Sequence, residues 1–426
     1  MSVKMTKLSD GASGMFIQSL RFNTTLISFN FYLPLKRENV AVNALLPFVL
    51  TTCGEKYPDF SRLNYKLNKL YGARLSASAE KIGDFQLLKM AISVIDDKYT
   101  LDNEQLTQQA CELLQSLLFE PKLADGAFHD SDVEREKRKA IEHIRGELSE
   151  KRIYAKNRMI EEMFSDEDYG VSKCGTEEDV QKITGESLYD AWRNLLAHAY
   201  IHVNVISRNL PSGLFETLSE KLSSINRSYI TDFSAVRPTK AATEVKTVTE
   251  RMDVAQGKLV MGFSSDICGE GERATSLMVM ADIFGGGPYS RLFSNVREKM
   301  SLCYYCAATS VRIKGLVVVE SGVEAQNAQK ARNEILNQLE IMKNGDFTDF
   351  EFESSIKGIT DSLKSSNDSQ ETIDIWYSVK MCSGRLYSPE DVIQELSCVT
   401  RENVIKAAQG IKLNTEYLLL PKEENK

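Results

Sequence analysis

The sequence predicts an α+β protein made of two similar halves. Segments with the period of helices alternate with segments with the period of strands along the 426 residues. Both halves follow the order helix, glycine turn, short helix, strand, glycine turn, strand, long helix. Gly54 and Gly83 in the first half are as far apart as Gly286 and Gly315 in the second. A polar segment rich in breaker residues, 228–250, lies between the halves.

These observations predict an N-terminal domain at 1–227, a linker at 228–250 and a C-terminal domain at 251–426. A chain of this length can give each domain its own apolar core.

In the first half, apolar alternation and apolar stripes define most elements. Pro34 ends the first expected strand, Pro47 stands near the first turn of the first expected helix, and Gly83 turns a hairpin. We expect strands at 26–33, 72–79, 84–94 and 200–206, and helices at 44–50, 61–70, 102–118, 131–163 and around 188–195.

In the second half, Thr348 and Glu351 form the capping box of one helix, and Pro389 and Thr400 begin two short ones. We expect strands at 256–263, 303–311, 315–322 and 417–420, and helices at 271–284, around 290–297 and at 325–342.

Composition limits the classes of function. A net charge of −8 argues against binding of nucleic acid, whose phosphates require a basic surface. No stretch approaches the ~20 apolar residues that span a bilayer, and the N-terminus lacks an apolar signal segment. We therefore expect a cytoplasmic protein without membrane or nucleic-acid partners.

The eight cysteines are scattered and do not indicate a disulfide framework. Cys303-Tyr-Tyr-Cys306 alone has the spacing of a zinc or redox pair. In a regular strand, residues three apart point to opposite faces, so we expect two separate buried thiols.

The most informative stretch, 285–304, reads GGGPYSRLFSNVREKMSLCY. The glycines and proline end one helix, and Ser290 is placed to cap the next. A phosphate-binding loop is disfavoured because no Gly-Lys run and no buried strand accompany the glycines. A plain surface turn remains an alternative.

This stretch resembles the C-terminal-half signature of the pitrilysin/insulinase-type metallopeptidases, the family that includes mitochondrial processing peptidase. The resemblance implies two halves, each with a mixed or antiparallel sheet and helices on one face, enclosing a chamber. It also implies that Arg297 and Tyr304 hold substrate carbonyls near the metal, with Gly286 and Gly287 beside the bound peptide.

The catalytic motif of that family is missing. Active members carry His-x-x-Glu-His on the first helix, and alignment on Gly54 puts its zinc-ligand slots at Leu45 and Val49 and its base slot at Phe48. Apolar side chains can neither bind zinc nor move a proton. The third ligand slot falls near Glu142 or His143. We expect no metal or cofactor in this chain.

The resemblance therefore implies a non-catalytic subunit of a heterodimeric peptidase. It would bind peptide and lend Arg297 and Tyr304 to the zinc site of a paralogous partner, with no zinc peptidase activity alone. The alternative is a purely structural or regulatory protein. The run Glu55-Lys56-Tyr57-Pro58 further resembles the subfamily associated with 5-aminopentanol modification of elongation factor P.

Overall fold

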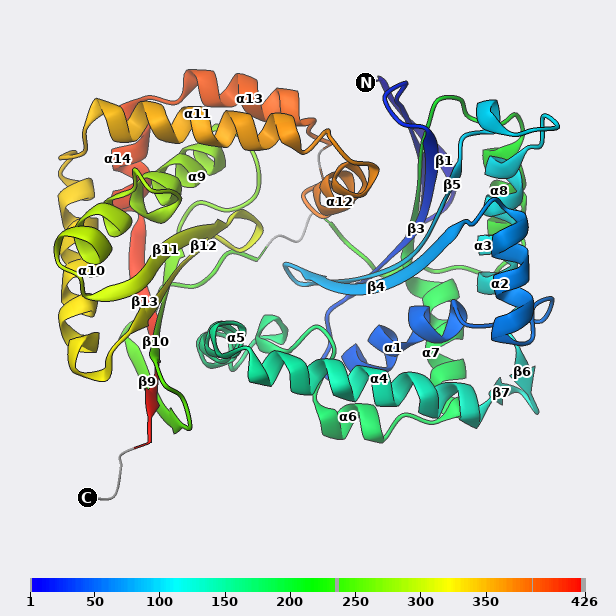
Figure 1. Cartoon of the computed structure of the whole chain (residues 1–426), viewed down its shortest axis with the longest axis horizontal. Helices are drawn as coiled ribbons and strands as arrows, with labels where there is room; N and C mark the ends of the chain where they lie inside the picture. Colours follow the sequence, from blue (N-terminus) through cyan, green and yellow to red (C-terminus); the bar gives the residue numbers. More distant parts are fainter. Residues whose placement is uncertain (1, 234–236, 385, 423–426) are drawn as a thin grey trace. The chain divides into compact units, whose positions relative to one another are not determined.

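The computed structural model describes residues 2–233, 237–384 and 386–422, which form two compact units, each built on one β-sheet (Figure 1). The first unit takes the described residues within 1–145, 171–232 and 369–378. The second takes those within 146–170, 233–368 and 379–426. The chain crosses between the units at 145–146, 170–171, 232–233, 368–369 and 378–379. The third crossing lies inside the range expected to be a linker, part of which (234–236) lies outside the described residues.

The first sheet has six strands in the order β1-β2-β8-β3-β5-β4. Neighbouring strands are antiparallel except for β2 and β8, which run parallel. The strands are β1 (Ser2–Ser9), β2 (Ala12–Gln18), β3 (Thr24–Pro34), β4 (Arg74–Ile82), β5 (Phe85–Ile95) and β8 (Tyr200–Ser207).

Helices cover one face of this sheet, as the resemblance implies, and enclose the largest apolar core of the unit. They are α1 (Val40–Leu50), α2 (Phe60–Lys69), α3 (Leu106–Phe119), α4 (Asp130–Ser149), α6 (Glu177–Gln181), α7 (Gly185–His198) and α8 (Leu214–Ser223). A two-residue ladder, β6 (Leu123–Ala124) and β7 (Ala127–Phe128), precedes α4. Two short 3-10 turns lie at Asp97–Tyr99 and Asp168–Gly170, the latter in the second unit.

The opposite face of the first sheet is polar and is covered by the first part of α12 (Gln370–Met381). Asp374 lies at its centre and is only 3% exposed. Its carboxylate pairs with Lys89 at 2.5 Å and accepts hydrogen bonds from Ser28 and Asn204. This network satisfies polar side chains that would otherwise be costly to bury.

The second sheet has five strands in the order β11-β12-β10-β13-β9. Here β13 and β9 run parallel, and the other pairs are antiparallel. The strands are β9 (Lys246–Met252), β10 (Gly257–Ser265), β11 (Cys303–Val311), β12 (Leu316–Val323) and β13 (Ile411–Pro421). When β1 is left out and the strands of each sheet are counted in chain order, both sheets have the order third, fourth, second, fifth, first. In each sheet the first and fifth strands form the parallel pair. The two halves therefore repeat one topology, as predicted.

The remaining α-helices of the second unit are α5 (Lys151–Met163), α9 (Glu272–Gly285), α10 (Ala328–Lys343), α11 (Asp349–Ser365), α13 (Pro389–Cys398) and α14 (Arg401–Gln409). Short turns lie at Arg312–Lys314 and Ala325–Asn327. α9 packs on β11, and α5 covers the other face of the sheet (Figure 1), where Met159 and Met163 press against Gly262. The capping boxes at Thr348, Ser388 and Thr400 begin the last three helices of the unit.

Several elements differ from the sequence prediction. The helix expected at 131–163 is broken at Glu150, whose backbone is extended and whose carboxylate caps α5. α1 begins at Val40, so Pro47 lies inside it and cannot donate to the Asn43 carbonyl. β1 and β2 were not expected, and β9 begins at Lys246 within the range expected to be a linker.

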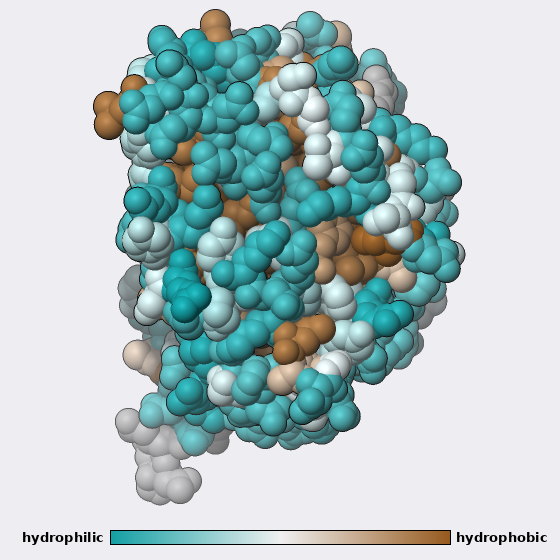
Figure 2. All heavy atoms as spheres, turned by 90° about the vertical axis from the view of Figure 1, so that its right-hand side faces the viewer, coloured by the Kyte–Doolittle hydropathy of each residue, from teal (hydrophilic) through white to brown (hydrophobic). Residues whose placement is uncertain are grey.

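In the part of the chain that the structure describes, no helix is long and apolar enough to cross a membrane. The molecular face in Figure 2 is mainly hydrophilic, with hydrophobic residues in separate small patches.

Candidate functional site

A cavity of about 380 Å³ lies in the first unit where the resemblance places the lost zinc motif. Its walls come from α1, β4, α4 and the segment before α6. The lining residues are Ala41, Ala44, Leu45, Phe48, Ser78, Ala79, Glu80, Glu136, Lys139, Ala140, His143, Lys173, Cys174 and Val180.

The motif slots on α1 are apolar and mostly buried. Leu45 is 3% exposed and Val49 1%, and both belong to the core of the unit, whereas Phe48 is 38% exposed and lines the cavity. Zinc requires nitrogen, sulfur or oxygen ligands, so these residues do not fit the metal. Among the described residues, no group of three or more His, Cys, Asp or Glu side chains could hold a metal ion.

α4 supplies the polar wall of the cavity. Glu136, Ala140 and His143 stand one and two turns apart and therefore share one helix face. Of the two residues expected near the third ligand slot, His143 lines the cavity and Glu142 is exposed outside the lining set. Glu136 was not singled out from the sequence, although its spacing to His143 could have identified this face.

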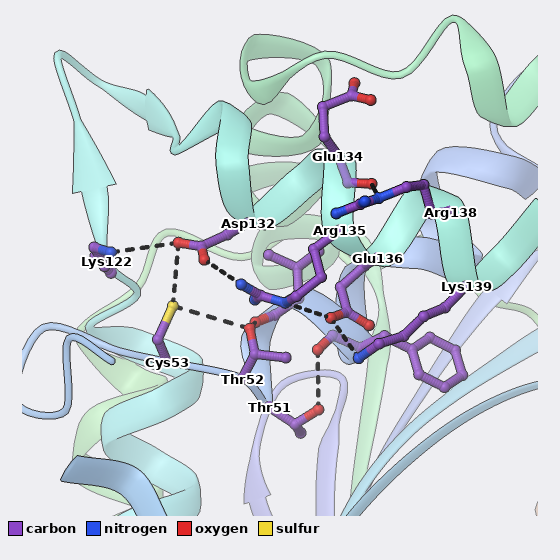
Figure 3. A network of polar contacts seen from close by, with 12 residues as sticks. Thr51, Thr52, Cys53, Lys122, Asp132, Glu134, Arg135, Glu136, Arg138 and Lys139 are labelled. Carbon is purple, nitrogen blue, oxygen red and sulfur yellow. Dashed lines mark hydrogen bonds and ion pairs between the residues drawn. The ribbon is translucent and has the colours of Figure 1, made fainter. Parts of the chain in front are cut away.

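The carboxylates beside the cavity are engaged by cations (Figure 3). Glu136 is 4% exposed and accepts from Arg135 Nε at 3.1 Å and from Lys139 Nζ at 2.9 Å. Asp132 accepts from Arg135 at 2.9 Å and from Lys122 at 3.4 Å. Burial opposes charge on Asp132, but these two cations outweigh it and lower the pKa of the carboxyl.

Cys53, which follows the C-terminus of α1, is part of the same network (Figure 3). Its Sγ lies 3.6 Å from Asp132 Oδ2. Burial, and then the Asp132 charge, raise the pKa of the Cys53 thiol, so the thiol stays protonated and donates to the carboxylate. Of the charged residues that line the cavity, Glu136 pairs with Lys139 and Glu80 pairs with Lys173 at 3.1 Å, and the other lining residues are mainly apolar.

The second candidate site, with Arg297 and Tyr304, lies in the second unit. The helix that carries Arg297, Leu292–Lys299, is a π-helix. The Met300 amide donates to the Asn295 carbonyl, five residues back, and the Leu302 amide to the Val296 carbonyl, both at 3.1 Å. Ser301, with φ of 52°, turns the chain directly into β11. Such wide helical turns and left-handed residues are enriched at functional sites.

The Arg291 side chain anchors the start of this helix. Arg291 is 9% exposed and binds Gln338, the Asp346 carbonyl and Glu351. The prediction that Ser290 caps the helix is wrong, because Ser290 is fully buried, its hydroxyl has no hydrogen-bond partner among the described residues, and the cap position is Arg291.

Arg297 and Tyr304 both reach the surface. The Arg297 side chain is 40% exposed, lies 4.5 Å from the Phe293 ring centroid and has Glu298 at 3.5 Å. Tyr304 is 63% exposed, and its hydroxyl has no hydrogen-bond partner among the described residues. The turn at Ser301 joins the helix of Arg297 to β11, so Arg297 and Tyr304 belong to one helix–turn–strand segment.

The glycines before this helix permit close packing. A Cβ on Gly285 would lie 2.4 Å from the Ala308 amide nitrogen, and one on Gly286 would meet the Asp282 carboxylate. Gly287 stands against the Tyr289 ring, whose hydroxyl donates to Asp282 at 2.7 Å. These contacts position the loop, and the assignment of Gly286 and Gly287 to substrate binding stays a prediction.

A β-bulge at Tyr304 changes the predicted geometry of the cysteine pair. Cys303 stands opposite Val323, and Cys306 stands opposite Ser321. Since Val323 and Ser321 are two residues apart on β12, the two cysteines share one face of the sheet. The expectation that they point to opposite faces is wrong, because the bulge adds one residue that sequence periodicity does not reveal.

Comparison with known proteins gives the family. The family model "Peptidase M16 inactive domain" matches residues 182–359. The chain is 31% identical over 422 residues to "Probable inactive metalloprotease YmfF" of Bacillus subtilis (strain 168), covering 96% of both chains. It is 25% identical over 292 residues to "Uncharacterized zinc protease YmxG" of the same strain, covering 66% of this chain and 69% of that protein.

The fold matches a solved structure over its whole length. A crystal structure of a conserved protein from Enterococcus faecalis V583 has a TM-score of 0.92, with 23% identity and full coverage of both chains. The sequence relatives and the repeated topology agree with the signature at 285–304. The chain belongs to the M16 peptidase family, the pitrilysin/insulinase-type metallopeptidases.

Proposed function

We propose that this chain is the non-catalytic subunit of a heterodimeric M16 metallopeptidase. It binds peptide and supplies Arg297 and Tyr304 to the zinc site of a paralogous partner. The observation that carries the proposal is the exposed Tyr304 hydroxyl, which has no hydrogen-bond partner among the described residues. A tyrosine retained only for packing would be expected to bury its ring in the sheet.

The chemistry of the two side chains fits this role. Peptide hydrolysis builds negative charge on the carbonyl oxygen, and donors aimed at that oxygen are among the largest contributions to catalysis. The Tyr304 hydroxyl is a neutral donor, and the Arg297 guanidinium is a fixed fork that can also hold the peptide backbone.

The cavity beside α1 explains why a partner is needed. Leu45, Phe48 and Val49 offer no metal ligand, and Glu136 already pairs with two cations. Zinc and the base that activates water therefore come from the other subunit. A zinc protease of the same family, such as the one that this chain partly resembles, has the properties required of that subunit. We extend the proposal to a cytoplasmic complex connected with elongation factor P modification.

One observation favours the alternative of a structural or regulatory subunit. Arg297 stacks on Phe293 and lies beside Glu298, so its side chain already has local partners. In that case Arg297 and Tyr304 would be dispensable for the rate of the partner's reaction.

Co-expression with a paralogue that keeps His-x-x-Glu-His tests the assembly. We expect a one-to-one complex by size-exclusion chromatography with light scattering, and peptidase activity only in that complex. Separate species at micromolar concentration would contradict the heterodimer. A complex whose activity equals that of the partner alone would favour the structural alternative.

A further inference from the structure

The bulge in β11 places two thiols on the same face of the strand. Cys303 and Cys306 stand opposite residues two apart on β12, which corresponds to a rise of about 6.6–6.8 Å. Disulfides usually join Cα atoms about 4.4–6.8 Å apart, so this spacing falls at the upper end of the range. The two side chains are also hydrogen-bonded to each other.

The surroundings of Cys303 favour its thiolate. The hydrogen bond from Cys306, with help from Ser321 and the positive charge of Arg297, lowers the pKa of Cys303 to about 7 although burial acts in the other direction. The same hydrogen bond and burial raise the pKa of Cys306. The nearby cations Arg152 and Lys258 lie over the Tyr305 ring, on the other face of the strand.

Other thiols of the chain lack this environment. Burial raises the pKa of Cys111 to about 12 and also raises that of Cys268. β11 is the outermost strand of its sheet, and Cys303 is 9% exposed against 4% for Cys306, so Cys303 is the thiol that a small reagent meets first at the unpaired edge. Reactive cysteines sit in such electropositive, partly accessible places.

We propose that Cys303 and Cys306 form a redox-active dithiol that a low-molecular-weight disulfide oxidises to an intrachain disulfide. The bulge that aligns the two side chains, and the Arg297 charge beside them, carry this inference. It does not depend on the proposed function. Because Tyr304 is the extra residue of the bulge, closing the bridge also changes the backbone that presents Tyr304.

The exchange proceeds in two steps. The Cys303 thiolate attacks one sulfur of the small disulfide, forms a mixed disulfide and releases one small thiolate. Cys306 then loses its proton and attacks the Cys303 sulfur, and a second small thiolate leaves. The two cysteines lose two electrons and two protons in total, and the small disulfide is reduced to two thiols.

The test treats the reduced full-length chain with oxidised glutathione and digests it with trypsin. Cleavage after Lys299 and Arg312 gives a single peptide, 300–312, that contains both cysteines and no others. We expect this peptide to lose two hydrogens in mass. We also expect iodoacetamide to alkylate Cys303 at pH 7 at least tenfold faster than Cys268.

Two variants identify the roles of the cysteines. Cys306→Ser should trap one glutathione on Cys303, and Cys303→Ser should leave Cys306 without an adduct. Cys268→Ser is the matched control and should react like the unchanged chain. Two results would overturn the proposal: a 300–312 peptide that keeps both hydrogens after oxidation, or alkylation of Cys303 no faster than that of Cys268. Both measurements are made on the chain without substitutions, so neither depends on the folding of a variant.

Discussion

At the scale of single residues, Arg297 gives a prediction about substrate binding in the assembled complex. Arg297→Ala should lower kcat and raise KM, because it removes both a donor to the transition state and a hold on the peptide in the ground state. Arg297→Lys keeps the charge but loses the planar fork, so it should restore less than half of the lost kcat/KM. Steady-state kinetics with a short peptide measure both effects. An unchanged KM in Arg297→Ala would contradict the prediction that Arg297 holds the peptide in the ground state.

His202 gives a prediction about pH. Its side chain is fully buried, Nδ1 lies 2.7 Å from Ser13 Oγ, and burial lowers its pKa to about 4. Because the folded pKa lies below the unfolded value of 6.5, the folded state binds fewer protons between these values. Stability is therefore complete above pH 6.5 and falls as the pH decreases toward 4, by at most about 3 kcal/mol.

Fluorescence from Trp192 and Trp376 reports on this transition, since both tryptophans lie in the first unit. Urea unfolding of His202→Gln should show a smaller loss of stability between pH 6.5 and 4 than the unchanged chain, even if the variant is less stable overall. The exposed His143→Gln variant should keep the original slope. An unaltered slope in His202→Gln would contradict this assignment.

Single residues also show which features of the site could be predicted from the sequence. The placement of the motif slots at Leu45, Phe48 and Val49 rests on alignment to the following Gly54 and stays a prediction, whereas the apolar character of α1 could be read directly from the sequence. The shared face of Cys303 and Cys306 could not, because a bulge depends on pairing with β12 and leaves no mark in the local period.

At the scale of elements, α1 and α4 give a prediction about restoring the motif. Leu45→His with Val49→His would bury two imidazoles in the apolar core, with little compensation from hydrogen bonds. We expect this double variant to lose at least about 3 kcal/mol in the urea unfolding of the first unit. Phe48→Glu is the matched comparison, because Phe48 is partly exposed and the change should cost less. Equal or greater stability of the double variant would contradict this view of α1.

Sequence periodicity located most helices and strands, but it predicted one helix where α4 and α5 are separate. The apolar stripe continues past Glu150, so periodicity alone does not predict a helix end at this residue. α5 packs on the second sheet, where Met159 and Met163 contact Gly262, and such a tertiary contact leaves no mark in the local period. β9 was missed for a related reason, since its pairing with β13 leaves most of its side chains exposed.

At the scale of the whole molecule, the equal glycine spacings correctly predicted a repeat, and the two sheets share one strand order. The chain alone should bind less than about 0.1 zinc per molecule and cleave no peptide, because the motif positions carry no ligands. Metal analysis of the purified chain checks this, with a zinc-bearing paralogue as the positive control. Close to one tightly bound zinc per chain would contradict it.

The most direct test of the account is the turnover of the Tyr304→Phe complex, normalised to folded heterodimer. Loss of one oxyanion donor typically costs about 100- to 1000-fold, so we predict at least about a tenfold fall in kcat. Since Tyr304 is 63% exposed, folding and assembly should be preserved. Tyr65→Phe, at a similarly exposed ring in the first unit, is the control and should leave kcat unchanged. An unchanged kcat in Tyr304→Phe would contradict the proposed role and leave a structural subunit.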